Sequence, residues 1–267
     1  MKVAFDPIAI DYDLRFSLSP IGKIQRSQVY KFLTPWIHSV KGNRVLDLGC
    51  GTGEDAIWFA NQNFSVTAID SSSEMIKVAR EKSEGLPNWE RIQYEALSID
   101  ELHFHFKDKM FDLVFSNFGA LNCVDPSYFS TLARTLSERL DSNGYVIFVI
   151  INNFCLWETL YFLYKTDLKN ILRRKSRSPV FANLNEETKI RTWYYSPESF
   201  GQYFNENFTI KKISPIGFMV PPSYFNFFQN NKNSFYLNVL ERVDQYNPFH
   251  RISAFASDHF IICMQKK

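Results

Sequence analysis

The sequence predicts an α/β fold, a doubly wound and mostly parallel sheet with helices on both faces. Between residues 41 and 151, short apolar runs alternate with segments of helical periodicity, which is typical of such sheets. A turn with glycine at every second position follows the first apolar run, at 49–53. The last run, 145–151, is apolar without a break, as expected of a strand that is covered on both faces.

The apolar runs and the segments between them give the order of the elements. Strands are expected at 45–48, 64–69, 91–94, 111–115 and 145–151. A helix in the first 40 residues should end at Pro35. A second should open with a capping box from Ser71 to Glu74 and run to about Lys82. A third should cover about 127–140 and stop at a turn signal, 141–144.

After residue 151 the pattern is looser. We expect an aromatic helix around 154–164, then a basic loop, and then a helix that starts at Ser196-Pro197-Glu198. Two late strands should follow at 208–210 and 259–263. The stretch of about 214–256 between them is too long for a hairpin turn, so we expect a substructure with its own role.

The glycine turn and the next acidic residue indicate a ligand site. Glycine permits a positive φ and a close approach of the backbone to a ligand. A strand, a glycine turn and a helix N-terminus form a site for a nucleotide-like ligand at the carboxyl end of a sheet. Asp70 ends the next strand, nineteen residues beyond Gly51, where it can accept hydrogen bonds from both hydroxyls of a ribose. That position serves NAD, FAD and S-adenosylmethionine alike.

The third glycine and the residues after it narrow the choice. The dinucleotide fingerprint has the order G-x-G-x-x-G, whereas here Gly53 comes one residue earlier and Glu54 and Asp55 follow it. Two carboxylates in a first helical turn suit the helix dipole but repel a pyrophosphate. A cationic sulfonium without phosphate fits better, and Asp47 adds a negative charge for an amino group. The spacing therefore favours S-adenosyl-L-methionine.

Residues 45–53, Val-Leu-Asp-Leu-Gly-Cys-Gly-Thr-Gly, resemble the first motif of the class I S-adenosylmethionine-dependent methyltransferases of the small-molecule type. Asp70 falls at the ribose-binding position of that family. The resemblance is strong over about 40–150 and weak over the last strands. It implies a seven-stranded, Rossmann-like methyltransferase fold, with a helical, aromatic lid and an insertion before the last strand.

The resemblance also implies the residues that contact the cofactor. Residues 95–97 resemble the segment that holds the adenine, with Glu in place of the commoner Asp, and 111–119 resemble the fourth strand and the loop beside the methyl group. The N-terminal helix should close over the cofactor. The expected contacts are Asp47, Gly49, Cys50, Gly51, Gly53, Asp70, Ser71, Met75, Glu95, Ala96, Leu97, Asn117, Phe118, Tyr12 and Arg26.

We therefore expect one methyltransferase domain over 1–267. Its parts are an N-terminal helical cap at 1–40, a cofactor-binding core at 41–151, a lid segment at 152–200, and the last strands at 201–267 with an insertion at 214–256.

Composition excludes several functions. The net charge of +2 gives no argument for nucleic acid binding. The four cysteines are scattered and suggest neither a metal site nor disulfides, which fits a reducing cytoplasm. Acidic residues near the N-terminus argue against a signal peptide, and the run 145–151 is too short to span a bilayer. We expect a cytoplasmic protein without membrane insertion.

The acceptor is expected to be a hydrophobic or aromatic small molecule, of the quinone, polyketide or lipid-precursor kind. Aromatic residues crowd the lid segment and the insertion, where they could wall an apolar pocket, although packing in the core also explains them. They are Trp157, Tyr161, Tyr164, Trp193, Tyr194, Tyr195, Phe218, Tyr224, Phe225, Phe227 and Phe228. The sequence does not decide between O-, N- and C-methylation.

No residue is assigned as the base. The loop 116–119 lacks the Asn/Asp-Pro-Pro-aromatic pattern of amino-methylating nucleic-acid enzymes, and Cys123 reads as a buried thiol. His103 and His105 read as surface residues. Either His250 or His259 could be a base, and both also have a structural interpretation.

Two other functions stay open. An RNA or protein methyltransferase could dock through a basic run, although a solvated loop is the simpler interpretation of it. That run is Lys169, Arg173, Arg174, Lys175 and Arg177. The chain could also be a non-catalytic partner subunit that binds S-adenosylmethionine.

Overall fold

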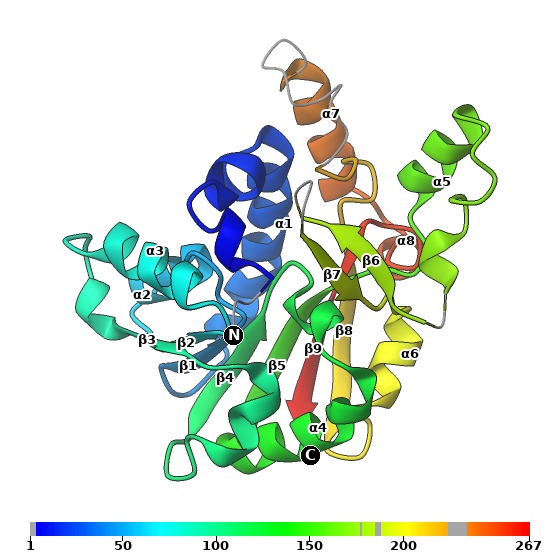
Figure 1. Ribbon diagram of the computed structural model, residues 1–267. Coiled ribbons are helices and arrows are strands. Elements are labelled where there is room, and N and C mark those ends of the chain that lie inside the picture. The colour runs from blue at the N-terminus through cyan, green and yellow to red at the C-terminus, as the bar shows by residue number, and fades with distance from the viewer. Residues whose placement is uncertain (1–3, 177, 185–187, 224–233) are drawn as a thin grey trace.

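The computed structural model describes residues 4–176, 178–184, 188–223 and 234–267. A seven-stranded sheet with the order β3-β2-β1-β4-β5-β9-β8 forms its centre (Figure 1). Its strands are β1 (Arg44–Leu48), β2 (Ser65–Asp70), β3 (Ile92–Ala96), β4 (Phe111–Ser116), β5 (Leu140–Ile151), β8 (Phe208–Ile216) and β9 (His259–Lys266). The first five strands are parallel, and β9 runs antiparallel to β5 and β8. The predicted fold class is confirmed.

Two apolar clusters cover the two faces of the sheet, because successive side chains of a strand point to opposite sides. Val45 and Phe115 pack under α1 (Pro20–Ile37), α2 (Glu54–Asn61) and α3 (Ser73–Ser83). Leu46 and Phe148 pack under α4 (Phe129–Arg139) and α6 (Pro197–Gln202). Buried residues on both faces explain why the strands read as continuous apolar runs.

The remaining elements gather mainly at the carboxyl end of the parallel strands, which is the upper end of Figure 1. The longer ones there are α5 (Leu156–Tyr164), α7 (Ser234–Gln245), α8 (His250–Ser253) and a two-stranded antiparallel sheet of β6 (Val180–Asn183) and β7 (Lys189–Thr192). Short helical turns complete the described chain: η1 (Asp6–Ile8), η2 (Asp13–Ser17), η3 (Trp89–Arg91), η4 (Ile99–Phe104), η5 (Ala120–Cys123), η6 (Pro126–Tyr128) and η7 (Arg173–Lys175). The small sheet was not predicted, since its segment was expected to be a loop.

Several predicted element ends were wrong. Pro35 lies inside α1, in its last turn, so the helix loses the one backbone hydrogen bond that this nitrogen cannot donate but continues to Ile37. Ser72 caps α3, not Ser71: its hydroxyl accepts a hydrogen bond from the backbone N–H of Met75 at 3.1 Å. The predicted helix start at Ser196 is confirmed, with Pro197 as the first helical residue.

The expected turn at 141–144 is a bulge instead. The pairing of β4 with β5 shifts between Phe111, which lies opposite Leu140, and Leu113, which lies opposite Tyr145. The extra residues loop out of the strand between these two pairs. The late strands are also longer than expected, so the segment between β8 and β9 spans 217–258.

Among the described residues, no helix is both long and apolar enough to cross a membrane.

Candidate functional site

The glycine turn between β1 and α2 uses its three glycines for two purposes. All three have positive φ, at 71°, 53° and 80° for Gly49, Gly51 and Gly53. A methyl group on Gly49 would collide with Ala120, and one on Gly53 with the Tyr94 hydroxyl. A methyl group on Gly51 would meet no atom within 4 Å. Two of the glycines therefore permit packing, whereas Gly51 faces open space that a ligand can enter.

Asp70 lies at the end of β2 with a fixed carboxylate. One oxygen accepts a hydrogen bond from the backbone N–H of Gly51 and the other from that of Ser72, both at 2.9 Å. Burial raises the pKa of Asp70 above its ordinary value, although these two hydrogen bonds oppose the shift. Each oxygen keeps accepting capacity, so the carboxylate can receive two hydroxyl groups of a ligand.

Asp47, on β1, is buried beside this turn without full hydrogen bonding. Its Oδ2 has no hydrogen-bond partner among the residues that the structure describes. Burial raises its pKa well above the ordinary value, and the neighbouring Asp55 adds to the shift. A buried polar atom without a partner is costly and suggests a missing partner, here a donor or cation. Within the same residues, the Nε of Arg26 is a buried donor without an acceptor.

A second group of polar residues lies between α1 and the first turn of α2. Asp55 accepts hydrogen bonds from Arg26 at 2.5 Å, from the Tyr30 hydroxyl at 2.9 Å and from Asn117 at 3.0 Å. Desolvation lowers the pKa of the Arg26 guanidinium, but Asp55 more than offsets it, so the pKa is raised overall. Arg26 also lies over the ring of Phe118, 5.0 Å from its centroid.

These pairs correct one step of the sequence argument. The carboxylates of Glu54 and Asp55 do not present free negative charge to a ligand. Arg26 forms an ion pair with Asp55, and Lys82 contacts Glu54 at 2.8 Å. Beside the turn, Asp47 keeps a carboxyl oxygen without a hydrogen-bond partner among the described residues.

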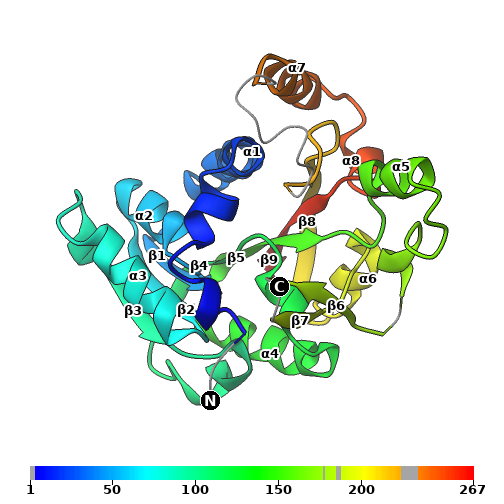
Figure 2. The same cartoon turned by 45° about the horizontal axis from the view of Figure 1, so that its top comes forward.

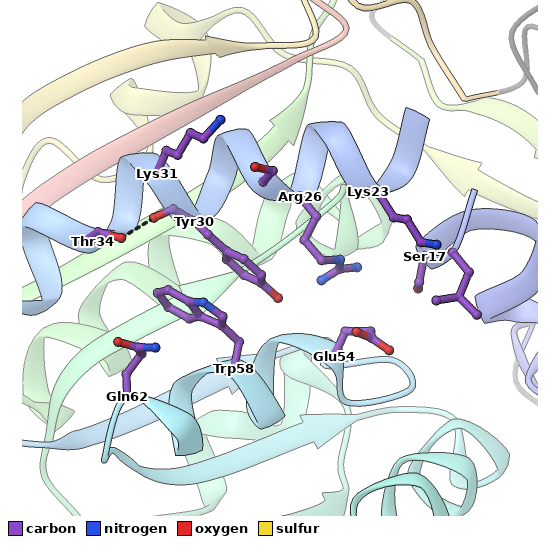
Figure 3. A pocket seen from close by; sticks show the side chains of 11 residues that line it. Ser17, Lys23, Arg26, Tyr30, Lys31, Thr34, Glu54, Trp58 and Gln62 are labelled. Atoms are coloured by element: carbon purple, nitrogen blue, oxygen red, sulfur yellow. Dashed lines mark hydrogen bonds between the residues drawn. The ribbon is translucent and has the colours of Figure 1, made fainter. Parts of the chain in front are cut away.

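An open groove of about 450 Å³ runs between α1 and α2 outside this group. Figure 3 shows Arg26 and Tyr30 reaching from α1 toward Glu54 and Trp58 on α2. The rings of Tyr30 and Trp58 stack at 4.3 Å, which closes the groove toward the core.

The N-terminal segment 4–18 lies across the glycine turn and α3. Asp6 accepts a hydrogen bond from Ser72, and Asp13 accepts one from Thr52, both at 2.6 Å. Ile8 and Ala9 pack on Met75. This segment, ahead of the expected helix, is the part of the chain that covers the turn.

Tyr12 belongs to this segment and lies near the charges of the site. Burial raises its pKa to about 12; Arg26 lowers it and Asp70 raises it. Of the other predicted contacts, Cys50 is buried within the turn and Ser71 is exposed.

The end of β3 lies beside Asp70. Ala96 is in register with Asp70, and the N–H of Leu97 donates to the Asp70 carbonyl at 2.9 Å. The Leu97 side chain packs in the core. The Glu95 carboxylate accepts a hydrogen bond from Gln93 at 2.8 Å.

The loop after β4 holds a strained aromatic residue at the same end of the sheet. Phe118 has φ of 41°, which is rare for a bulky side chain and is found where surrounding structure enforces it. The side chain of Asn117 accepts a hydrogen bond from the Phe118 N–H at 2.9 Å. The ring of His259 stands edge-on to Phe118, with centroids 5.5 Å apart. Asn117, Phe118 and His259 thus come together from distant parts of the chain.

His259 has a buried acidic neighbour that the sequence did not reveal. Its Nδ1 lies 3.2 Å from Asp258, whose other oxygen accepts a hydrogen bond from Arg174 at 2.9 Å. Burial raises the pKa of Asp258, but the charges of His259 and Arg174 hold it well below its ordinary value. Gln25 of α1 also donates to Asp258.

The interpretation of the basic run as a solvated loop was wrong for Arg174. Arg174 is buried and contacts both Glu158 and Asp258 at 2.9 Å, and Arg173 contacts Glu158 at 2.7 Å. Arg177 lies outside the described residues.

The aromatic residues do not form one pocket wall. Tyr195 packs in the core against Phe129, whereas Tyr164 is 83% exposed. The indole N–H of Trp157 donates to the Met219 carbonyl at 3.0 Å. Phe218 lines an apolar cavity of about 380 Å³ beside α7. Tyr224, Phe225, Phe227 and Phe228 lie outside the described residues.

The Cys123 thiol and the possible metal ligands can be examined in the structure. Burial raises the pKa of the Cys123 thiol to about 12, so it is not an activated nucleophile. Within the described ranges, no group of His, Cys, Asp and Glu side chains has the arrangement of a metal site.

Comparison with known proteins agrees with this geometry. A family model described as a methyltransferase domain matches residues 45–144. The chain is 26% identical over 190 residues to a demethylmenaquinone methyltransferase of Renibacterium salmoninarum, covering 71% of this chain and 75% of that protein. It is 29% identical over 164 residues to the ubiquinone/menaquinone biosynthesis C-methyltransferase UbiE of Geotalea uraniireducens, covering 60% and 67%.

Solved structures share the fold at low identity. A SAM-dependent methyltransferase from Methanosarcina mazei superposes with a TM-score of 0.59 at 20% identity, covering 87% of this chain and 97% of that one. A structure described as a DhpI–SAH complex superposes with a TM-score of 0.57 at 16% identity, covering 98% and 93%.

Proposed function

We propose that this chain, a class I S-adenosylmethionine-dependent methyltransferase, methylates an apolar or aromatic small molecule. One observation carries the proposal. The carboxyl end of the sheet brings together the open turn at Gly51, the carboxylates of Asp47 and Asp70, and a second group of side chains, Phe118 and His259.

The polar groups around Asp47, Gly51 and Asp70 fit S-adenosylmethionine. The Asp70 carboxylate is fixed to accept two ribose hydroxyls, and the open space above Gly51 admits the ligand. Asp47 Oδ2 lacks a donor and Arg26 Nε lacks an acceptor among the described residues, which complements the ammonium and carboxylate of an amino acid. When bound, the cofactor supplies a methyl group on a cationic sulfur. The N-terminal segment would exclude water above it.

The other residues predicted to contact the cofactor are proposed to do so because of where they lie in the fold. Glu95, Ala96 and Leu97 lie next to Asp70 and would contact the adenine, Asn117 and Phe118 would flank the methyl group, and Tyr12 would cover it. Gly49, Cys50 and Gly53 shape the turn, and Ser71 and Met75 stand at the start of α3.

The acceptor class is proposed from the apolar surroundings and from the relatives. Phe118 presents an aromatic ring next to His259 at the same end of the sheet. The relatives named above act on menaquinone or ubiquinone precursors according to their names. A quinol-like acceptor gives up a proton when it is methylated. His259, whose Nδ1 lies 3.2 Å from Asp258, would receive that proton, and the methyl group takes its position on the acceptor.

Replacement of His259 tests this role. His259→Gln should lower the turnover number by roughly 10²–10⁴-fold, as expected when a general base is removed. The affinity for S-adenosylmethionine should stay unchanged. His250→Gln, on the exposed start of α8, is the control and should retain full activity. Equal turnover in both variants would rule out His259 as the base.

The competing functions receive less support from the structure. Arg173 and Arg174, two of the five basic residues proposed for RNA or protein docking, form ion pairs with Glu158 or Asp258 instead of facing a partner.

A labelling experiment tests the acceptor class. The protein is incubated with methyl-labelled S-adenosylmethionine and, separately, with an apolar solvent extract, RNA and protein from cells. We expect label in apolar products, identified by mass spectrometry. Label confined to RNA or protein would contradict the proposal.

A further inference from the structure

The helix α5 has an inverted amphipathic arrangement. Leu156, Leu160, Leu163 and Tyr164 recur at the i, i+4, i+7 and i+8 positions of one face, which is the pattern of a helix that packs on a core. In this protein that stripe faces solvent, with Leu163 56% and Tyr164 83% exposed. The residue of α5 that is fully buried is the acidic Glu158. A stripe of this kind on the outside is typical of an interaction surface.

The orientation of α5 is enforced by ion pairs. Glu158 accepts hydrogen bonds from Arg173 at 2.7 Å and from Arg174 at 3.0 Å, and Arg174 continues to Asp258 on the sheet side. The segment after α5 therefore folds back under the helix and holds its acidic side inward. Rotating the apolar stripe into the protein would break these buried pairs, which is strongly unfavourable.

The exposed stripe continues beyond α5 and is interleaved with lysines. Leu168 and Leu172 are 74% and 59% exposed. Lys165, Lys169 and Lys175 alternate with them, and none of the three has an acidic partner within the described residues. We call residues 156–176 the α5 arm. Figures 1 and 2 show α5 projecting from the body of the fold at the end of the sheet where the candidate site lies.

We propose that the α5 arm docks on the surface of an anionic lipid bilayer. Leucine and tyrosine side chains that enter the headgroup region, together with lysines that contact anionic lipids, are the features of interfacial helices. The lack of a spanning helix in the described ranges is compatible with binding at the surface. The proposal deepens the proposed function, because an apolar acceptor would reside in that bilayer.

Charge favours a bilayer over a second copy of the chain. In a symmetric dimer the same patch faces itself, so two patches that each hold more lysines and arginines than acidic residues would face each other. Such like-charge contacts are unfavourable, whereas an anionic headgroup region attracts each lysine.

Co-sedimentation with lipid vesicles tests the proposal without cofactor or acceptor. The full chain should sediment with phosphatidylcholine vesicles that contain phosphatidylglycerol, and much less with phosphatidylcholine alone or at high salt. The double variant Lys165→Gln/Lys169→Gln should bind about fivefold more weakly for each lysine removed. Tyr164→Ser and Leu168→Ser should also lose binding.

Phe104→Ser is the matched control, because Phe104 is 67% exposed on η4, away from the arm, and its loss should leave vesicle binding unchanged. Calorimetry with S-adenosylmethionine separates the two proposals, since the arm variants should keep wild-type affinity. The docking proposal is overturned by no sedimentation with anionic vesicles at low salt. It is equally overturned by the same loss in Phe104→Ser, or by a dimer in sedimentation velocity that Leu168→Ser dissociates.

Discussion

Asp47 shows how a residue of the site can be unfavourable for the fold. It is 1% exposed and lacks a partner for Oδ2 among the described residues. Because burial raises its pKa in the folded state, the protein is stabilised by this group below the pKa of the unfolded chain and loses that contribution as the pH rises through the raised value. A ligand ammonium beside the carboxylate would restore it.

Asp47→Asn should therefore stabilise the ligand-free protein by about 1–3 kcal/mol at neutral pH, because the carboxyl group is ionised in the unfolded chain and burial disfavours that ionised form. The gain in melting temperature should shrink toward pH 4, where the wild-type carboxyl group is protonated. Thermal scans across pH measure this, and calorimetry should show weaker S-adenosylmethionine binding.

Asp112→Asn is a control that should change stability in the opposite direction. Arg44 donates to Asp112 and lowers its pKa despite burial, so this change should destabilise the protein at neutral pH. A lower melting temperature for Asp47→Asn at pH 8 would refute the account of Asp47.

The glycine turn allows ligand binding and folding to be separated. Gly51→Ala places a methyl group in open space at a positive φ, which costs about 1–2 kcal/mol, so the variant should fold. S-adenosylmethionine binding should be lost, as measured by calorimetry. Gly49→Ala should instead lower the melting temperature strongly, because its methyl group meets Ala120. Full affinity in folded Gly51→Ala would contradict a ligand above this turn.

At the scale of elements, α5 and η7 depend on buried ion pairs rather than on an apolar core. Arg174 contacts Glu158 and Asp258 at 2.9 Å, and all three side chains are buried. The pKa of Asp258 is depressed, so its stabilising contribution is present above the pKa of the unfolded chain and is lost as the pH falls below it.

Arg174→Met should cost roughly 3–5 kcal/mol, because it removes the buried cation that contacts both Glu158 and Asp258. Chemical denaturation measures the loss. Lys175→Met, at the exposed neighbouring position, should change stability by no more than about 0.5 kcal/mol. A similar effect of the two substitutions would show that the ion pairs are dispensable.

The elements that sequence could predict are those with local signals. The strand, glycine turn and helix of residues 45–61 follow from hydrophobic period and glycine spacing, and the α6 start follows from Ser196-Pro197. The start of β5 was missed because its bulge has the composition of a turn. β6 and β7 were missed because short, half-exposed strands carry little periodicity.

The same distinction applies to the site. Asp47, the glycines and Asp70 could be proposed from sequence, because one motif and one fixed spacing contain them. The pairing of Arg174 with Asp258 joins residues 84 positions apart, and nothing local marks either one. The environment of His259 and the outward stripe of α5 likewise depend on tertiary packing, which a single sequence does not display.

At the scale of the whole molecule, one end of the sheet carries every part of the proposed function. The glycine turn, Asp70, the strained Phe118 and His259 meet there, and the N-terminal segment and the α5 arm border them (Figure 1).

The central claim is that Asp70 and the glycine turn hold S-adenosylmethionine, and calorimetric titration of this cofactor into the wild type and Asp70→Ala tests it most directly. The wild type should bind, and Asp70→Ala should bind roughly 10–100-fold more weakly, because hydrogen bonds to a charged group contribute about 1.5–3 kcal/mol. Asp100→Ala, at an exposed acidic position, should bind like the wild type. Equal affinity of Asp70→Ala and the wild type would contradict the assignment of the site.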